Sequence, residues 1–373
     1  MINKKRMLQT FLELVKIDSE SRKEKKVADY ILKKIAKYKL PYKFDKSNKK
    51  TGSEIGNLII YKNFSSKKDT VVLSSHMDTV VPGLGIKPIV KKNHVQSNGN
   101  TILGADDKSG LAIIIEVLET FSEKKIPHLN IEAAITTCEE IGLLGAKFLN
   151  YKLLKSKSGI VLDSTSPDRL VTKGPSSDYF TITVTGIEAH SGINPEKGIS
   201  SIKVSAEIIN KIKIGRIFKD TTLNIGKIKG GSAINIVPGK TEILCEIRSH
   251  REKIINNILN KIKSDLLKIE KKYKKINKGF SITMNKERIY DSINISKNEL
   301  IIKRIMAAAK KNNFKTLPVE TGGGADANFF VKNGINTVNL GTGMREFHTK
   351  KEKLILKEFY KAGEIVFDTL VDI

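Results

Sequence analysis

Residues 130–146, NIEAAITTCEEIGLLGA, place two adjacent carboxylates, Glu139 and Glu140, where an apolar strand pattern ends and a helix is expected to begin. Acidic residues are common in the first turn of a helix because they complement its dipole, so the pair has an ordinary structural explanation. Adjacent carboxylates also repel each other, and a positive group held beside them would remove that repulsion. The pair is therefore a candidate for a functional site.

The first 170 residues alternate helical patterns with short, nearly continuous apolar runs. One helical pattern, residues 21–38, opens with a capping box from Ser21 to Glu24. The runs that we expect to be strands are GNLIIY (56–61), TVVLSSH (70–76), NIEAAITT (130–137) and SGIVLDS (158–164). Apolar strands separated by helices are typical of an α/β doubly wound sheet that is buried on both faces.

The middle of the chain has a different pattern. From DYFTITVTG (178–186) to GFSITMNKERIY (279–290), the expected order is β-α-β-β-α-β, which is typical of a ferredoxin-like antiparallel sheet with helices on one face. Helical and apolar patterns then resume. We therefore predict a catalytic domain in two parts, residues 1–174 and 291–373, with an inserted lid or dimerisation domain at residues 175–290.

Composition excludes several classes of protein. The chain has 373 residues, of which 39% are apolar, and no apolar run of eighteen residues, so we expect a globular protein with room for two domains and no membrane span. Its N-terminus has apolar residues at helical spacing, unlike a secretory signal. Only two cysteines occur, Cys138 and Cys245, which favours a reducing, cytoplasmic location over a disulfide framework.

The net charge of +26 raises the hypothesis of nucleic-acid binding. However, the lysines are scattered along every segment, and we find no zinc finger, RNA-reading aromatic motif or Arg-rich tail. We therefore predict no nucleic-acid partner.

Imidazole and carboxylate side chains follow several predicted strands. His76 and Asp78 end one strand, Asp163 ends another, and Asp106 precedes a helix, while His348 lies in a loop before the last helix. In an open α/β sheet, ligands bind beyond the carboxyl ends of the strands. We therefore expect these side chains to converge at one edge.

A cluster of histidines and carboxylates without cysteine suits zinc, with cobalt or manganese as alternatives. An excess of carboxylates suits two divalent ions that share a bridging carboxylate. One of Glu139 and Glu140 can then bind a metal ion, while the other acts as a general base.

Taken together, the motifs resemble those of the M20 metallopeptidases, and most of all the peptidase T branch of tripeptide aminopeptidases. The resemblance covers nearly the whole chain and rests on seven ordered motifs: SSHMDTV (74–80), LGADDKSG (103–110), TTCEEIGLLGA (136–146), VLDS (161–164), EAHSGINPEKG (188–198), AINIVPG (233–239) and FHT (347–349).

The resemblance implies a role for each residue of the predicted metal centre. Asp106 would bridge two ions, with the peptide bond to Asp107 held cis. The other implied ligands are His76 and Asp163 for one ion, and Glu140 and His348 for the second. Asp78 would orient His76. Glu139 would be the general base that generates a metal-bridging hydroxide for attack on the scissile carbonyl.

For the inserted domain, the resemblance implies a homodimer in which His190 helps to stabilise the oxyanion in the neighbouring subunit. Asn235 and Arg248 would contact the substrate, the guanidinium of Arg248 being suited to a peptide carboxylate. A turn residue and a surface charge are the ordinary explanations for these two positions.

The predicted function is hydrolysis of short peptides, with a metal-dependent deacylase or carboxypeptidase of the same family as the alternative. A third hypothesis, an inactive member that only binds its ligand, is disfavoured because the ligands and the base are all present. One departure is Cys138, which stands where relatives commonly have Gly, and its thiol could make the enzyme sensitive to oxidation.

Overall fold

A computed structural model describes residues 1–372 of the chain, which divides into two compact units. The first unit comprises Met1–Lys173, Asn294–Glu320 and Ala325–Ile373, and the second comprises Gly174–Ile293 and Thr321–Gly324. The sequence placed the domain boundaries after residues 174 and 290, and it did not anticipate that a short Gly-rich segment near residue 320 packs with the second unit.

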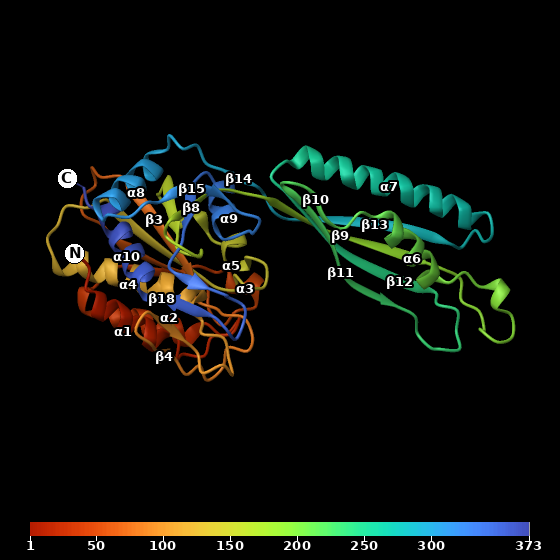
Figure 1. Cartoon of the computed structure of the whole chain (residues 1–373), viewed down its shortest axis with the longest axis horizontal. Coiled ribbons are helices and arrows are strands. Elements are labelled where there is room, and N and C mark those ends of the chain that lie inside the picture. The colour runs from red at the N-terminus through yellow and green to blue at the C-terminus, as the bar shows by residue number, and fades with distance from the viewer. Residues whose placement is uncertain (373) are drawn as a thin grey trace. The chain divides into compact units, whose positions relative to one another are not determined.

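Within the described residues, the first unit is built around a mixed nine-stranded sheet (Figure 1). Its four central strands are parallel, and antiparallel strands extend it on both sides. The strands are, in spatial order, β1 (Tyr42–Phe44), β2 (Leu58–Lys62), β6 (Asn130–Thr136), β3 (Thr70–His76), β7 (Ser158–Val161), β16 (Asn336–Leu340), β8 (Arg169–Gly174) and β14 (Ile293–Asn294), with β15 (Leu317–Glu320) beside β8.

Both faces of the central strands are buried. Along β3, Val71 and Leu73 belong to the large core formed with the long helices, whereas Val72 points to the opposite face and is also fully buried. The helices of this unit are α1 (Lys4–Leu14), α2 (Lys25–Ile35), α3 (Asn48–Thr51), α4 (Ala105–Glu123), α5 (Leu144–Lys147), α8 (Leu300–Lys311), α9 (Ala327–Lys332) and α10 (Leu356–Leu370), with 3-10 turns η1 (Ala36–Tyr38) and η2 (Tyr151–Leu153). The predicted α/β class is therefore confirmed.

A small antiparallel sheet also belongs to this unit. Its strands are β17 (Met344–Arg345), β18 (Lys353–Ile355), β5 (His94–Gln96) and β4 (Ile89–Val90). The pairing of β18 with β5 attaches the C-terminal loop that carries His348 to the segment preceding α4.

The second unit is a five-stranded antiparallel sheet in the order β10-β11-β12-β9-β13. Helices α6 and α7 bury their apolar residues with alternate residues of β9 and β12, so both helices cover one face. The element bounds are β9 (Ser176–Thr185), η3 (Pro195–Lys197), α6 (Ser201–Lys211), β10 (Gly215–Phe218), β11 (Thr221–Gly230), β12 (Lys240–Ser249), α7 (Glu252–Lys274) and β13 (Ser281–Tyr290). Apart from the extra edge strand β10, this is the predicted ferredoxin-like arrangement.

Two local predictions were wrong. The Ser21 hydroxyl does not cap α2; it donates instead to Asp78, while Glu24 is buried and accepts hydrogen bonds from other segments. Glu139 and Glu140 do not begin a helix but lie in a turn, because the backbone at Cys138 is left-handed (φ 54°) and α5 starts only at residue 144.

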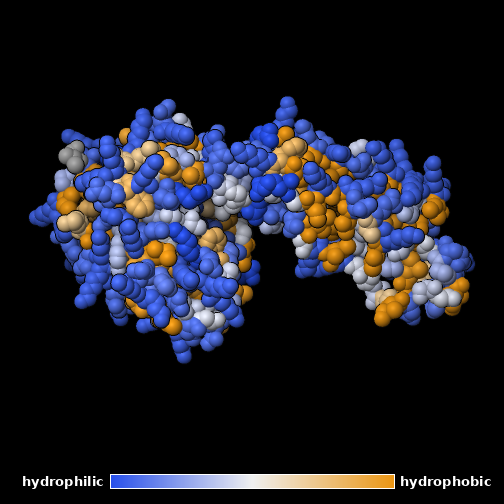
Figure 2. Space-filling model, viewed as in Figure 1, coloured by the Kyte–Doolittle hydropathy of each residue, from blue (hydrophilic) through white to orange (hydrophobic). Residues whose placement is uncertain are grey.

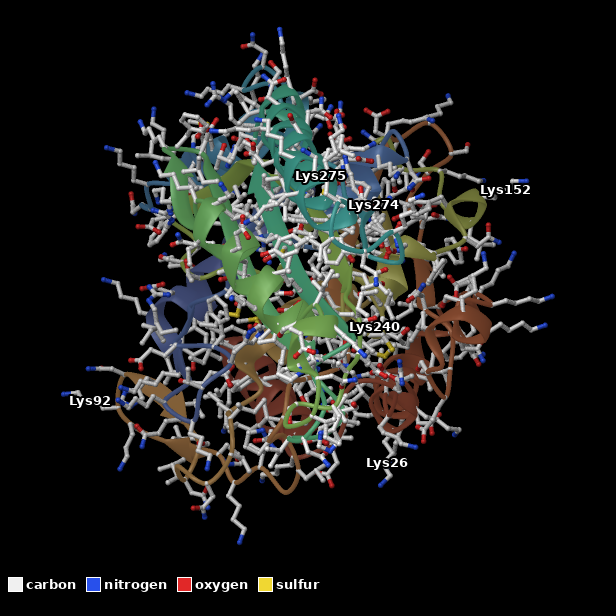
Figure 3. All side chains as sticks on the ribbon, turned by 90° about the vertical axis from the view of Figure 1, so that its right-hand side faces the viewer. Lys26, Lys92, Lys152, Lys240, Lys274 and Lys275 are labelled. Carbon is white, nitrogen blue, oxygen red and sulfur yellow. The ribbon has the colours of Figure 1, made fainter. Side chains whose placement is uncertain are left out.

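No helix among the described residues combines the length and the apolar composition that a membrane crossing requires. Lysines project from many sides of the chain, including Lys26 and Lys92 of the first unit and Lys240 of the second (Figure 3). This spread of positive charge gives no single basic face.

Candidate metal centre

The carboxyl ends of parallel strands bring the predicted site residues together. His76 is the last residue of β3, which lies between β6 and β7. The turn after β6 carries Glu139 and Glu140, and Asp163 follows β7 by two residues. Because these strands run parallel, the three segments meet at one edge of the sheet.

Two further segments complete the site. Asp106 lies at the start of α4, and the peptide bond between Asp106 and Asp107 is cis, as the resemblance implied. His348 comes from the loop between β17 and β18 and has a left-handed backbone (φ 62°). Regular secondary structure therefore supplies only part of the site, and loops supply the rest.

A continuous chain of contacts links four of the predicted ligands. His76 Nε2 lies 3.1 Å from Asp106 Oδ1, and the other oxygen of Asp106 lies 3.3 Å from His348 Nε2. His348 Nε2 also lies 2.9 Å from an oxygen of Glu140. Asp106 thus stands between the two histidines with one carboxylate oxygen directed to each, as a bridging ligand must.

Among the described residues, two groups of side chains could hold a metal ion. One consists of His76, Asp106 and Glu140, and the other of His76, Asp107 and Asp163; in each, the donor atoms lie within 4.8 Å of one another. Asp107 is an addition to the predicted ligands, since the resemblance implied only a cis peptide bond before it. Its carboxylate accepts hydrogen bonds from the backbone N–H groups of Gly110 and His76, at 3.2 and 3.4 Å.

Glu139 differs from the other carboxylates of the site. It is 9% exposed, and no hydrogen bond or ion pair to its carboxylate occurs within residues 1–372. Burial, together with the nearby charges of Asp163 and Asp326, raises the pKa of Glu139 well above its ordinary value, although His76 opposes the shift. Glu139 is therefore a buried carboxylate that is free to accept a proton.

Asp78 was expected to orient His76 through its carboxylate, but its main contacts are different. The carboxylate accepts the backbone N–H groups of Glu139 and Glu140, at 3.0 and 3.2 Å, and the Ser21 hydroxyl at 2.6 Å. His76 Nδ1 lies 2.9 Å from the Asp78 carbonyl oxygen and 3.5 Å from the carboxylate. Asp78 thus orients His76 mainly through its backbone and fixes the turn that carries both glutamates.

Glu352 is a site residue that sequence reasoning missed. Its carboxylate is 1% exposed and accepts the backbone N–H groups of Leu103, Gly104 and Asp106, at 2.7, 2.8 and 3.0 Å. Burial and the charge of Asp106 raise its pKa to about 7, against the effect of these donors. Since Glu352 follows His348 by four residues, it connects the His348 loop to the backbone of Asp106.

Asp326 is a further buried carboxylate of the first unit, 2% exposed. One of its oxygens accepts a 2.5 Å hydrogen bond from the Thr136 hydroxyl, and the other is buried and has no partner within residues 1–372. Burial raises the pKa of Asp326 to about 6. The small residues around it, GADA (324–327), gave no sign of this contact with β6.

Cys138 lies behind the site and is fully buried. Its backbone N–H donates to Glu24 at 3.0 Å, and burial, reinforced by the charge of Glu24, raises the pKa of the thiol to about 12. A protonated, enclosed thiol reacts slowly with oxidants, so the structure does not support the oxidation-sensitive role considered for Cys138. The left-handed backbone explains why Gly is suited to this position.

The donor set fits divalent cations. Buried Lys108 donates to Ser19 Oγ and the Met77 carbonyl, and burial lowers its pKa to about 8. The carboxylates beside His348 raise its pKa to about 10, so positive charge is favoured at this position. Because the site holds more carboxylates than cationic side chains, and because imidazole and carboxylate are zinc ligands, these residues suit bound metal ions.

The other predicted residues belong to the second unit. His190 and Asn235 lie in adjacent exposed loops, where the Ser191 N–H donates to the Asn235 carbonyl at 3.0 Å. Arg248 is partly buried and contacts Glu246 at 2.8 Å and the Gly322 carbonyl at 3.4 Å. The structure thus pairs His190 with Asn235 but separates both from Arg248, and the roles of all three in binding stay predictions.

Comparisons with known proteins show which family the chain resembles. A family described as "Peptidase dimerisation domain" matches residues 176–274, and "Peptidase family M28" matches residues 57–189. The uncharacterized protein YqjE of Bacillus subtilis is 36% identical over 369 residues, which cover 98% of each chain.

Two solved structures are similar over nearly their whole length. An aminopeptidase PepT from Bacillus cereus is 36% identical, with a TM-score of 0.88 and coverage of 99% of this chain and 98% of that one. A tripeptidase from Staphylococcus aureus is 35% identical, with a TM-score of 0.92 and the same coverage. The chain therefore belongs to the M20 family of metallopeptidases, in its peptidase T-like branch, and is a peptide hydrolase.

Proposed function

We propose that this peptidase is a dizinc tripeptide aminopeptidase that uses Glu139 as its general base. The observation that carries the proposal is the state of Glu139, which is buried beside the chain of contacts from His76 to Glu140 yet accepts no hydrogen bond within the described residues. A carboxylate that is enclosed but unpaired can take up and release a proton without first breaking another contact.

The metal ligands in this proposal divide into two sets that share Asp106. His76 and Asp163 complete one set, and Glu140 and His348 complete the other. Asp107, whose oxygen lies near His76 and Asp163, is an additional candidate. When bound, the ions supply Lewis-acid polarisation of the scissile carbonyl and lower the pKa of water.

The side chains of the protein account for the proton transfers. Glu139 takes a proton from the water that attacks the scissile carbonyl carbon, and it returns this proton to the amine nitrogen that leaves. Asp78 holds the backbone N–H groups of Glu139 and Glu140, so that the base keeps a fixed position relative to the ligands.

The substrate class rests on the relatives. One similar structure is an aminopeptidase and the other a tripeptidase, and at 35–36% identity this favours short peptides with a free amino terminus. The proposed contacts to the substrate come from His190, Asn235 and Arg248. Of these, Arg248 already holds Glu246, so a peptide carboxylate would have to share or replace that partner.

The second unit supports a proposal about assembly. We propose that the protein is a homodimer through this unit, because it matches a peptidase dimerisation domain and exposes large apolar side chains, among them Ile214, Phe218 and Ile228. Hydrophobic residues cover part of its surface in Figure 2. A cytoplasmic location is also proposed, since both cysteines are free and buried. Analytical ultracentrifugation of the full chain tests the dimer directly.

The activity test compares a free tripeptide, its N-acetylated form and the matching dipeptide, each with metal-loaded and chelator-treated protein. Cleavage of the free tripeptide alone, lost on chelation and restored by zinc, is the expected result. Cleavage of the acetylated peptide would replace the proposal by the deacylase or carboxypeptidase alternative. Absence of any metal-dependent cleavage would refute the assigned substrate class.

A further inference from the structure

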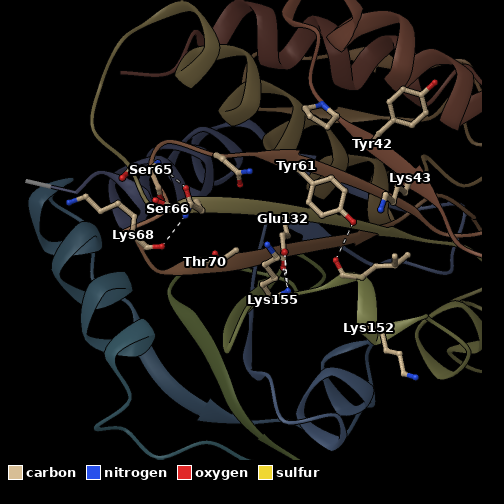
Figure 4. A pocket seen from close by; sticks show the side chains of 14 residues that line it. Tyr42, Lys43, Tyr61, Ser65, Ser66, Lys68, Thr70, Glu132, Lys152 and Lys155 are labelled. Carbon is tan, nitrogen blue, oxygen red and sulfur yellow. Dashed lines mark hydrogen bonds between the residues drawn. The ribbon is translucent and has the colours of Figure 1, made fainter.

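A pocket lies in the first unit, at the edge of the sheet opposite to the metal centre. It has a volume of about 620 Å³ and is reached from the amino ends of β3 and β6, where Thr70 and Asn130 begin these strands (Figure 4). The metal centre uses the carboxyl ends of the same strands, so the two sites are separate. Neither the proposed reaction nor any predicted site residue involves this pocket.

One wall of the pocket is fixed by Asn130, which is 6% exposed. Its side-chain oxygen accepts the backbone N–H groups of Phe64 and Ser65, at 2.8 and 3.2 Å, and its amide donates to the carbonyls of Ser65 and Lys68, at 2.8 and 2.9 Å. All four hydrogen bonds of the Asn130 side chain therefore fix the loop at residues 64–68.

The opposite wall is fixed by Glu132, two residues further along β6 and 2% exposed. Its carboxylate accepts the backbone N–H groups of Lys155 and Ser156, at 2.9 and 3.0 Å, and the Ser156 hydroxyl at 2.6 Å. The Tyr61 hydroxyl adds a bond to the Leu153 carbonyl at 3.1 Å. The pocket is thus built by buried polar groups that hold its walls, and the negative charge of Glu132 is already engaged.

The charge of the lining is positive. Lys43, Lys152 and Lys155 line the pocket, and within residues 1–372 their ammonium groups make no hydrogen bond or ion pair. A fourth lysine of the lining, Lys68, is paired with Asp372. The one carboxylate of the lining, Glu132, already accepts hydrogen bonds, so it does not neutralise these three ammonium groups. Together they attract a multiply charged anion.

An aromatic side chain of the lining, Tyr61, indicates a second feature of the ligand, a planar ring. Tyr61 and Lys43 lie on the same face of the β1–β2 pair, because Lys43 is opposite Ile59 in the register; Tyr42, opposite the buried Ile60, points to the other face. A partly exposed aromatic ring next to ammonium groups is suited to stack on a planar ring whose phosphate the lysines neutralise. The volume lies within the range of small-molecule sites.

We propose that this pocket binds a small phosphorylated ligand that also carries a planar ring, of the size of a nucleoside monophosphate. The lysines bind the phosphate, and Tyr61 stacks on the ring. Binding here is independent of the peptidase proposal, because it uses neither the metal ligands nor Glu139.

The test measures binding of adenosine 5′-monophosphate, ribose 5-phosphate and inorganic phosphate to the metal-loaded full chain by isothermal titration calorimetry. The pocket variant is Lys43→Ala/Lys155→Ala, which keeps the backbone N–H of residue 155 that holds the wall. Its matched control, Lys26→Ala/Lys92→Ala, removes the same two charges from exposed positions elsewhere in this unit (Figure 3). Phosphate captured at the metal centre would be equal in both variants.

We expect the pocket variant to bind adenosine 5′-monophosphate about tenfold more weakly than the wild type, and the control to differ by less than about twofold. Tyr61→Leu should weaken the binding of this nucleotide by about tenfold through lost stacking and leave that of ribose 5-phosphate unchanged, while Tyr61→Phe, which keeps the ring and removes only the hydrogen bond to Leu153, should bind like the wild type. Equal losses in the pocket and control variants would overturn the proposal, since binding would then follow net charge. A nucleotide affinity that no pocket substitution changes would overturn it as well.

Discussion

Replacing Glu352 by glutamine tests whether this residue positions the metal centre. In the structure, one carboxylate oxygen accepts the N–H groups of Leu103 and Gly104, and the other accepts the N–H of Asp106. Glutamine has the same size but only one acceptor oxygen. The amide should turn that oxygen toward the pair of donors, because two hydrogen bonds are kept and only one is lost.

The hydrogen bond that is lost is then the one from the backbone N–H of Asp106. Its buried N–H would face the NH₂ group of glutamine, and an unpaired buried donor costs about 1–3 kcal/mol. Because the carboxylate of Asp106 stands between both histidines, a shift of its backbone should weaken metal binding. Loss of a group that orients a metal ligand typically lowers metal affinity by about tenfold to a hundredfold.

The assay is competition for zinc against a chromophoric chelator, with thermal unfolding measured on the same samples. The matched control is Glu346→Gln, which removes the same charge from an exposed side chain in the same loop. We expect weaker zinc binding in Glu352→Gln and little change in the control. If Glu352→Gln lowered the unfolding temperature without changing zinc affinity, the residue would stabilise the fold without positioning the site. An equal loss of zinc affinity in Glu352→Gln and Glu346→Gln would refute the argument from hydrogen bonds.

Three further outcomes are expected. Glu139→Gln should keep its bound metal and lose about 10²–10⁴ in kcat, as measured by peptide turnover and metal content; unchanged turnover would exclude Glu139 as the base. Cys138→Gly should lose activity in peroxide at the same rate as the wild type, because the thiol is buried and protonated; slower loss in the variant would contradict this. Chelator-treated protein should melt lower at about pH 8 than at about pH 5. Burial raises the pKa of Glu139, Asp163 and Asp107, so their protonated forms stabilise the fold at low pH and this stability is lost as the pH rises through the raised pKa values. Zinc should reverse that dependence, because it binds the deprotonated ligands and so stabilises the fold more as the pH rises. A flat profile without metal would refute the raised pKa values of these carboxylates.

The sequence predicted best those elements that are buried on both faces. The apolar runs of β3, β6 and β7 were recognised because no solvent-facing residues interrupt them. The small sheet of β17, β18, β5 and β4 was not predicted, since strands of two or three residues have no hydrophobic period to detect. The edge strand β10 was not predicted either, because it has only four residues and three of them are exposed.

Candidate ligands could be found from the sequence because they end strands, and parallel strands end at one edge of a sheet. The groups that hold these ligands could not be found in that way. Glu352 and Leu103 are 249 positions apart, and no local pattern connects them. Asp326 meets Thr136 across a similar distance in sequence. Such contacts depend on how loops meet in the folded chain.

The paired glutamates show how these supporting contacts and the chemistry depend on each other. A helix beginning at Glu139 would have left the first N–H groups to water or to a capping side chain, and its dipole would have favoured the two carboxylates. The chain instead turns at Cys138, and buried carboxylates of Asp78 and Glu24 accept the N–H groups of this turn. The two glutamates therefore lack a helix dipole and lie among further negative charges, an arrangement that is unfavourable unless cations are present. The turn makes sense as part of a cation site, because bound metal ions remove the repulsion from Glu140 and the neighbouring carboxylates while leaving Glu139 free to accept a proton.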